Sequence, residues 1–460
     1  MIRRLAAVLA LLLVAACTGG DGGTGGGGEP VASSSEDVPG VIVVASGRDV
    51  TGKNGIRQQL IDAWNQRQQR ENSGFSARLV ELPGSADEQR SQLLGALQSG
   101  SADYDVVNLD VTWVPEFAAA GLIRALPEDL VDDDVIPSVA ETAWWDGDVY
   151  AVPFNSDVGL LYYRRDYLRQ AGVHPTDLGD DASWDDLRDL TEALDGHLPA
   201  DAYDKGWTTQ LAAYEGRTVN AVEAFASAVR DVALVDEDGR YTGDVGDLRA
   251  GVAELRRRTE PPYTLQDAVH SDEAASVSDF AEGRTAFLRH WPYVYPALHR
   301  TFTEEQLGVA PLPGRAVLGG QNLAVAKGSQ RAGKAADLIR FLTGRESERC
   351  LLDAGFAATR SSAYGDGVRC PAAGAGPSAS PTGEGAADRV PRDAAGRPAY
   401  ARTILLPALK DAVHRPRTPL YGAFTQTFTA QLGPLFGNDP PGDEVLAQRL
   451  DAALRRVLPD

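Results

Sequence analysis

Apolar positions along the first hundred residues follow two periods in turn. β-Branched runs and short alternating segments indicate strands, and apolar positions three and four residues apart indicate helices. Ser85 and Glu88 form a capping box, which predicts the start of a helix at that point. The predicted elements are strands at 41–44, 77–82 and 105–109 and helices at 55–70 and 85–97. This strand–helix alternation predicts an α/β fold with a parallel sheet.

The same mixture of periods continues to the end of the chain. Ser183 is expected to cap a helix, and Gly344 is expected to lie at the C′ position of another. The pattern predicts strands at 149–152 and 159–163 on either side of 153–157, mostly helix at 183–260, a helix ending near Leu288, a strand at 318–325, and helices at 332–342, 418–436 and 443–457. No internal repeat is present, so the chain is not a repeat protein.

The amino-terminal stretch indicates export. Arg3 and Arg4 precede an apolar run at 5–16, which is shorter than the roughly 20 apolar residues that a spanning helix needs. This layout is typical of a signal peptide, and its end, LVAAC, resembles a bacterial lipobox, in which Cys17 becomes lipidated. An ordinary signal peptide cut after residue 16 is the alternative. The Gly- and Ser-rich segment at 17–40 is then a flexible tether on the extracellular face of the cell membrane.

Length and charge limit what the rest of the molecule can be. Some 440 residues follow the signal peptide, too many for one ordinary core, so two lobes are expected. An apolar content of 43% and a charged content of 24% are those of a soluble globular protein. The formal net charge of −21 argues against nucleic acid or anionic lipid as a partner.

Two further cysteines, Cys350 and Cys370, lie in the globular part. In an oxidising exterior a disulfide between them is expected, with two free thiols as the alternative. Neither has a CxxC partner or a nearby histidine, so no metal site is expected. The segment at 371–397 is low in complexity and reads as an exposed loop.

Catalytic motifs do not occur. The sequence holds no GxSxG, HExxH, P-loop or GxGxxG motif, and its six histidines are scattered. With 65 acidic residues, a pair of carboxylates is no evidence for a glycosidase. No enzyme activity and no cofactor are therefore expected.

Other residues have the chemistry of a binding site for a hydroxylated ligand. Asp110 follows a predicted strand, where α/β sheets bind ligands, although it could equally cap the next helix. Trp291 and Tyr293 belong to an aromatic cluster that suits a sugar ring, with core packing as the alternative. Gly320 and Asn322 lie in a glycine-rich turn, and Arg415 stands in the proline-bracketed segment RPRTP, where a plain turn and a surface arginine are the alternatives.

The chain resembles the family 1 extracellular solute-binding lipoproteins of ABC sugar importers. The motifs YDVVNLDVTWVPEFAAAGLI, YAVPFNSDVGLLYYRRDYL, FAEGRTAFLRHWPYVY, GGQNLAVAKGS and AADLIRFLTGRESER carry this resemblance in order and spacing. ELPGSADEQRSQL, HWPYV and HRPRTPLY are most similar to the actinobacterial trehalose-recycling lipoproteins. The segment between residues 295 and 319 is shorter than in those proteins, and the insert before residue 397 is additional.

The resemblance implies two hinged α/β lobes of the periplasmic-binding-protein type, with a sugar between them. Asp110 matches a sugar-binding aspartate, Trp291 a stacking tryptophan and Arg415 a binding arginine. Gly320 and Asn322 match the glycine-rich site loop. Asp157 stands where relatives carry an asparagine, and Gln89 is a weaker match.

The expected protein is a monomeric receptor that binds trehalose or another α-linked sugar and delivers it to a membrane permease. The first lobe is predicted at 41–152 plus 284–326 and the second at 153–283 plus 327–460, with hinges near Pro153 and Lys327. Three alternatives remain: a receptor that presents its ligand to a sensor, a surface carbohydrate-active enzyme, and a binder of another solute.

Overall fold

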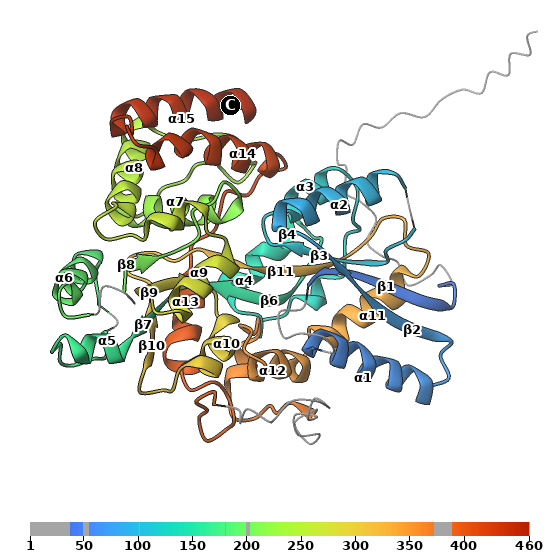
Figure 1. The fold of residues 1–460 in the computed structure, drawn as a ribbon. Helices are drawn as coiled ribbons and strands as arrows, with labels where there is room; N and C mark the ends of the chain where they lie inside the picture. The colour runs from blue at the N-terminus through green and yellow to red at the C-terminus, as the bar shows by residue number, and fades with distance from the viewer. Residues whose placement is uncertain are drawn as a thin grey trace, which may run out of the picture.

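Two sheets organise the computed structural model, which describes residues 37–48, 55–100, 102–179, 181–198, 203–371 and 389–459. The predicted signal peptide, Cys17 and most of the tether therefore lie outside the described residues. The larger sheet has the strand order β2-β1-β3-β11-β6 (Figure 1). Its strands are β1 (Gly40–Gly47), β2 (Phe75–Leu82), β3 (Val106–Asp110), β6 (Val152–Val158) and β11 (Leu318–Val325).

The larger sheet is mixed in direction. β1 pairs in parallel with β2 and β3, as the strand–helix alternation predicts, whereas β11 pairs antiparallel with both β3 and β6. Side chains alternate between the two faces of each strand. Val44 and Val106 therefore pack against one group of helices, and Ala45 and Val107 pack against another.

Helices cover both faces of this sheet. One face packs against α1 (Ile56–Arg70), α11 (Ala332–Leu342) and α12 (Arg345–Asp353). The other packs against α2 (Ala86–Gln98) and α3 (Val114–Ala119). The predicted capping box of α2 is present, because Ser85 and Glu88 each bond the backbone of the other.

The second sheet has the strand order β10-β7-β9-β8. β7 pairs antiparallel with β9 and β10, and β8 pairs in parallel with β9. Its strands are β7 (Leu160–Arg164), β8 (Lys205–Thr208), β9 (Thr285–His290) and β10 (Leu307–Pro311). Around it lie α5 (Arg165–Gln170), α6 (Trp184–Leu194), α9 (Glu273–Ala281), α10 (Val294–Thr301) and α13 (Leu406–Asp411), the last preceded by a π-helical turn at Ala401–Leu405.

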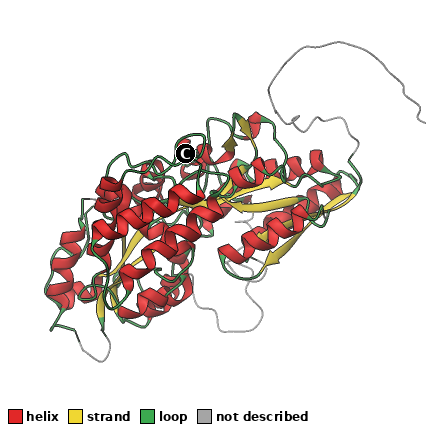
Figure 2. Cartoon of the chain, turned by 90° about the horizontal axis from the view of Figure 1, so that it is seen from above, coloured by secondary structure: helices red, strands yellow, loops and turns green. Residues whose placement is uncertain are grey.

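Four longer helices form a group beside the second sheet, where Figure 1 shows them together at the upper left. They are α7 (Glu215–Ala228), α8 (Val245–Thr259), α14 (Tyr421–Leu432) and α15 (Asp443–Val457). Their core is continuous with the face of the larger sheet that α2 and α3 cover. Seen from above, helices flank the strands along the whole length of the molecule (Figure 2).

Short elements complete the chain. α4 (Pro137–Ala140) precedes a hairpin of β4 (Trp144–Trp145) and β5 (Asp148–Val149). The 3₁₀ turns are Glu128–Leu130, Glu141–Ala143, Gln266–His270, Ser361–Tyr364 and Gly433–Phe436. Among the helices of the described ranges, none combines the length and the apolar character that crossing a bilayer requires.

Strand pairing corrects several expectations. Residues 153–157 do not separate two strands but lie inside β6, where β11 pairs with them. The predicted helix ending near Leu288 is instead strand β9, and β8 interrupts the segment that was expected to be mostly helical. A strand buried on both faces has no alternating pattern, so its sequence is easily confused with a buried helix.

The predicted lobe limits also differ from sheet membership. β9 and β10 were assigned to the first lobe but pair with β7 in the second sheet. α11 and α12 were assigned to the second lobe but pack on the larger sheet. The chain passes between the sheets at Gly159, from β6 to β7, and again between β10 and β11.

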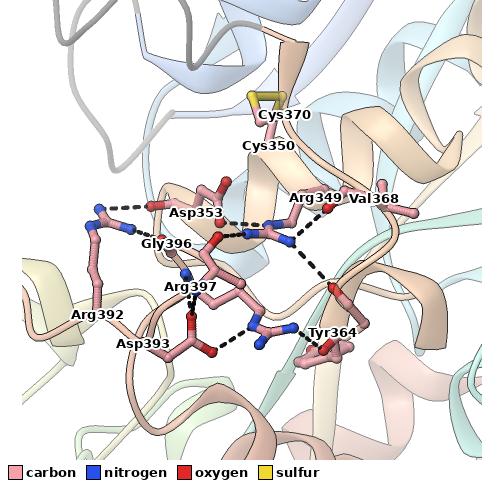
Figure 3. Close-up of polar contacts among 12 residues, drawn as sticks. Arg349, Cys350, Asp353, Tyr364, Val368, Cys370, Arg392, Asp393, Gly396 and Arg397 are labelled. Carbon is pink, nitrogen blue, oxygen red and sulfur yellow. Dashed lines mark hydrogen bonds and ion pairs between the residues drawn. A yellow bond between two sulfur atoms is a disulfide. The ribbon is translucent and has the colours of Figure 1, made fainter.

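A disulfide joins Cys350 of α12 to Cys370 (Figure 3). Next to it, the Arg349 guanidinium donates to the carbonyl oxygens of Val368 (2.8 Å) and Ala395 (2.5 Å). Arg397 donates to the Tyr364 carbonyl (2.5 Å). These contacts hold the chain on either side of the predicted 371–397 loop in place. Val368 and Ala395 are held against α12, and Arg397 is held against the 3₁₀ turn at Ser361–Tyr364.

Candidate functional site

Asp110 ends strand β3, next to the antiparallel strand β11. Its Oδ1 accepts from the backbone nitrogen of Thr112 (2.9 Å) and from the Thr112 hydroxyl (2.7 Å), which closes the turn after β3. Asp110 does not cap α3, because the N-cap of that helix is Trp113 and no side chain bonds it. The same oxygen accepts from Nη2 of Arg415 at 2.9 Å. Asp110 thus closes the turn after β3 and also faces a cation from a distant part of the chain.

Arg415 links Asp110 to a second carboxylate, Glu215. Only 3% of Arg415 is exposed, and its Nη1 donates to Oε1 of Glu215 at 2.7 Å. Glu215 is the first residue of α7, where a helix N-terminus favours negative charge. It also accepts from the hydroxyls of Tyr421 and Thr425, both on α14. We call Asp110, Glu215 and Arg415 the Asp110 group.

Burial and charge act in opposite directions on this group. Burial by itself lowers the pKa of the Arg415 guanidinium, but the neighbouring Asp110, Tyr421 and Glu215 hold that pKa well above its ordinary value. Burial raises the pKa of Glu215, and Arg415 only partly opposes it. Arg415 is therefore a permanent cation between two carboxylates, and its charge is matched only while both stay close to it.

Trp291 lies against a second buried arginine. The guanidinium carbon of Arg289 lies 3.8 Å from the centre of the Trp291 ring, within the range of a cation–π contact. Arg289 donates to both oxygens of Glu223, at 2.6 and 3.1 Å, and these two side chains are 1% and 2% exposed. The Tyr162 hydroxyl donates to the Trp291 carbonyl (3.2 Å). Trp291 itself stays half-buried, so its ring is supported without being enclosed.

The predicted glycine-rich turn is part of strand β11, where Gly319 and Gly320 give Trp291 and Asp157 room to approach. A Cβ on Gly319 would lie 3.1 Å from the Trp291 ring and 3.2 Å from Cβ of Asp157. Gly320 has a φ of 111°, and a Cβ there would lie 2.4 Å from the Asn155 carbonyl oxygen, so only glycine fits. Gly320 thus acts through the backbone, where β11 passes close to β6 opposite Ser156.

Asp157 is a carboxylate without a hydrogen bond on one oxygen. Its Oδ1 is buried and has no partner. Burial raises the pKa of Asp157 to about 7, although Arg57 and Arg289 oppose this. The carboxyl therefore changes charge near neutral pH, close to Trp291.

Three predicted site residues have other contacts in the structure. Asn322 does not join the Asp110 group: it is buried, and its Nδ2 donates to the carbonyl (3.1 Å) and hydroxyl (2.9 Å) of Thr142. Its neighbour Gln321, by contrast, accepts from Arg57 and Asn108. Tyr293 packs edge-on against His290, 5.4 Å between ring centres. Gln89 lies in the first turn of α2, and its Nε2 donates to the Gly84 carbonyl (2.9 Å).

The sequence did not single out Glu215, Arg289, Glu223 or Arg57. Arg57 of α1 donates to Ser46 (2.9 Å), Asn155 (3.2 Å) and Gln321 (2.8 Å), and so ties the ends of β1, β6 and β11 together. A charged residue among apolar neighbours in a strand, as Arg289 is in AFLRH, was the one available signal. Within the residues that the structure describes, no group of three or more potential metal ligands occurs.

Comparison with known proteins places the chain in a family. The family model for bacterial extracellular solute-binding proteins matches residues 59–368, so the chain belongs to that family. Its members bind solutes and are not enzymes, which agrees with the lack of catalytic motifs.

Individual relatives show the same assignment. A probable ABC transporter-binding protein of Deinococcus radiodurans is 28% identical over 66% of this chain and 73% of its own length. Among solved structures, maltose-bound MalE3 of T. maritima superposes with a TM-score of 0.72 at 22% identity, covering 91% of this chain and 100% of that one. The GacH receptor of Streptomyces glaucescens gives 0.69 at 19% identity, covering 92% and 99%. These structures establish the two-lobed α/β fold.

The buried pair of Arg289 and Glu223 makes a direct prediction for stability. Glu223→Ala leaves the Arg289 charge buried without its partner, so we expect the free energy of unfolding to fall by about 3–5 kcal/mol. Urea denaturation followed by circular dichroism measures this. The matched control is Glu71→Ala, which breaks the exposed pair with Arg67 (57% and 47% exposed) and should leave the midpoint unchanged. Equal urea midpoints for the two variants would contradict the view that the buried ion pair of Arg289 and Glu223 stabilises the fold.

Asp157 makes a prediction about pH. The unfolded chain releases this proton near pH 4, whereas the native state keeps it up to about pH 7. Because the native state binds more protons in this interval, the contribution of Asp157 to stability decreases as pH rises through it. We expect the difference in Tm between Asp157→Asn and the unchanged protein to grow in favour of the variant from pH 5 to pH 8. Parallel Tm curves would contradict a raised pKa.

Proposed function

We propose that the protein is the substrate-binding component of an ABC importer and binds an uncharged carbohydrate between its two lobes. The single observation that carries this is the Asp110 group. In this group, Arg415 joins Asp110, at the carboxyl end of the central strand β3, to Glu215, at the start of α7. Relatives support the class, since one is a probable ABC transporter-binding protein and two solved structures of the same fold were determined with maltose or acarbose bound.

The chemistry of the site suits hydroxyl groups. The Asp110 carboxylate can accept from two adjacent hydroxyls, and Arg415 and Glu215 supply a donor and an acceptor within 3 Å of one another. The half-buried Trp291 ring offers a flat apolar face for the C–H side of a pyranose. A ligand lacking a matching hydroxyl would leave a buried charged group unpaired, which costs affinity by factors of up to about 10⁴.

Lobe closure follows from the same contacts. A ligand shifts the balance between open and closed states only through contacts that improve on closure. Contacts made at once to Asp110 on one side and to Glu215 and Arg415 on the other have this property. The closed, loaded form then delivers its sugar to membrane permease subunits. Trehalose or another α-linked disaccharide is the first candidate, on the resemblance of HWPYV and HRPRTPLY to trehalose-recycling lipoproteins.

The proposed location is the extracellular face of the cell membrane, through lipid on Cys17. A diacylated cysteine gives a stable anchor where a single acyl chain gives only marginal binding. The segment at 17–40 would let a monomeric body reach the permease.

Sugar binding is tested by titration calorimetry with trehalose, maltose, maltodextrins, sucrose, glucose and a β-linked disaccharide. We expect saturable heat with one or two related sugars. Asp110→Ala removes a charged hydrogen-bond acceptor, and we expect it to weaken binding by roughly 10- to 100-fold. Trp291→Ala should weaken binding by about tenfold.

The matched control is Asp337→Ala on α11, a 62% exposed carboxylate that lies outside the Asp110 group and should bind normally. No heat with any of these sugars, from protein whose circular dichroism shows it folded, would rule out the carbohydrate proposal.

The anchor is tested separately by replacing one atom. We expect Cys17→Ser to move the protein from the detergent phase to the aqueous phase in Triton X-114 partitioning, with its sugar affinity unchanged. Partitioning into detergent despite this substitution would show that another part of the chain holds the membrane.

A further inference from the structure

A cavity of about 840 Å³ shares Arg415 with the Asp110 group, but Asp110, Glu215 and Trp291 do not line it. Its walls are the β4–β5 hairpin, the end of α7 with the loop that follows it, and the segment at 412–417. The size lies within the range of roughly 300–1,000 Å³ that is usual for small-ligand sites. The proposed function leaves this space unused.

Arginine side chains line the cavity. Arg315, Arg415 and Arg417 all contribute to its wall, and the Nε of each is buried without a hydrogen bond. Arg415 is almost wholly enclosed, at 3% exposure. Guanidinium groups in a cavity wall can donate hydrogen bonds to the oxygens of a hydroxylated ligand.

Its aromatic wall is the tryptophan pair of the hairpin. Trp144 and Trp145 both line the cavity and are both half-buried, so each keeps part of its ring accessible. The Trp144 carbonyl accepts from Nη2 of Arg417, which fixes the hairpin against the segment at 412–417. Aromatic faces beside hydrogen-bond donors suit a ligand with one apolar and one hydroxylated side.

The charges in the wall favour an uncharged ligand. Four arginines and four carboxylates line the cavity, so their formal charges cancel. Burial and the adjacent Arg417 and Arg415 lower the pKa of His414 to about 4, so this imidazole is neutral at pH 7. It lies 3.4 Å from Glu141. A phosphate or carboxylate would meet no excess of positive charge here.

We propose that this cavity is an accessory carbohydrate site, which holds an uncharged, hydroxylated sugar unit against Trp145 and Arg417. The unit is either the far end of an oligosaccharide whose other end is bound at the Asp110 group, or a separate sugar molecule. The inference rests on the proposed function, because it assigns a second site for the same class of ligand.

The cavity and the Asp110 group are mechanically joined. The segment at 412–417 lines the cavity and also carries Arg415 to Asp110 and Glu215. A ligand that holds this segment against the β4–β5 hairpin therefore also holds Arg415 in position. Occupation of one site should favour occupation of the other, since affinity coupling is reciprocal.

The test is titration calorimetry with the disaccharide that binds and with its longer oligomers, on the full chain and three variants. Trp145→Ala removes the aromatic face, Trp145→Phe keeps one, and Arg417→Gln keeps the side-chain size without the charge. If the far end of one oligosaccharide occupies the cavity, Trp145→Ala should weaken the longer oligomers by about tenfold and leave the disaccharide unchanged. Trp145→Phe should restore most of this loss.

If a separate molecule occupies the cavity, the unchanged protein should bind two sugars, and Trp145→Ala and Arg417→Gln should each bind one. Unchanged affinity and stoichiometry for every sugar in both variants, with Tm preserved, would overturn the accessory site and leave the proposed function intact. An absence of heat from the unchanged, folded protein would overturn both. A loss of disaccharide binding in folded Trp145→Ala would also overturn the accessory role, because the hairpin would then belong to the first site.

Discussion

The site depends on one buried cation, Arg415, held between two carboxylates that come from different parts of the fold. Asp110 ends a strand of the larger sheet, and Glu215 begins α7 beside the second sheet. A buried guanidinium is costly unless its charge is matched, so the two carboxylates must lie on either side of it. This requirement couples the relative position of the two lobes to the geometry that a ligand would meet.

A second buried ion pair, Arg289 with Glu223, supports Trp291 of the candidate site. Arg289 holds Glu223 with two hydrogen bonds, and its flat face supports Trp291. Glu223 also accepts from the Val317 backbone nitrogen (3.2 Å), just before β11. The pair therefore connects the second sheet, α7 and the chain crossing into β11. Trp291 keeps its orientation because the groups behind it are fixed, while its ring remains half-buried.

The sequence predicted local elements well where one face of a helix or strand is buried. The capping boxes at Ser85 and Ser183 are both present, and the helices at 332–342 and 443–457 have the predicted bounds. It failed at two buried strands, although it placed the equally buried β11 at its observed bounds. The sequence predicts the end of a helix at β9, whose apolar stretch AFL shows no alternation. It predicts a break between two strands within β6, because PFNSD holds a proline and polar residues typical of a turn. The predicted lobe limits differ from sheet membership, because β9 and β10 pair with β7, which is distant from them in sequence.

For individual candidate site residues too, the sequence indicated the residue type, and the structure decided which side chain faces the site. Residue types and settings predict Asp110, Trp291 and Arg415 as site residues, and the family resemblance matches the same positions. Asn322 was chosen on equal grounds, yet the structure turns it toward Thr142, whereas the adjacent Gln321 meets Arg57. Side chains of neighbouring strand residues point to opposite faces, so a one-residue difference decides which of them reaches a site.

What the sequence determined by itself was the local chemistry: where helices start, which segments are apolar, and which residue types could meet a sugar. These depend on neighbours a few positions apart. What only the tertiary structure decided was which distant charges meet. Glu215 and Arg415 are 200 positions apart and share a hydrogen bond, and Arg57 reaches Gln321 across 264 positions. Such pairings follow from strand order and helix packing, which depend on the burial of the whole chain at once.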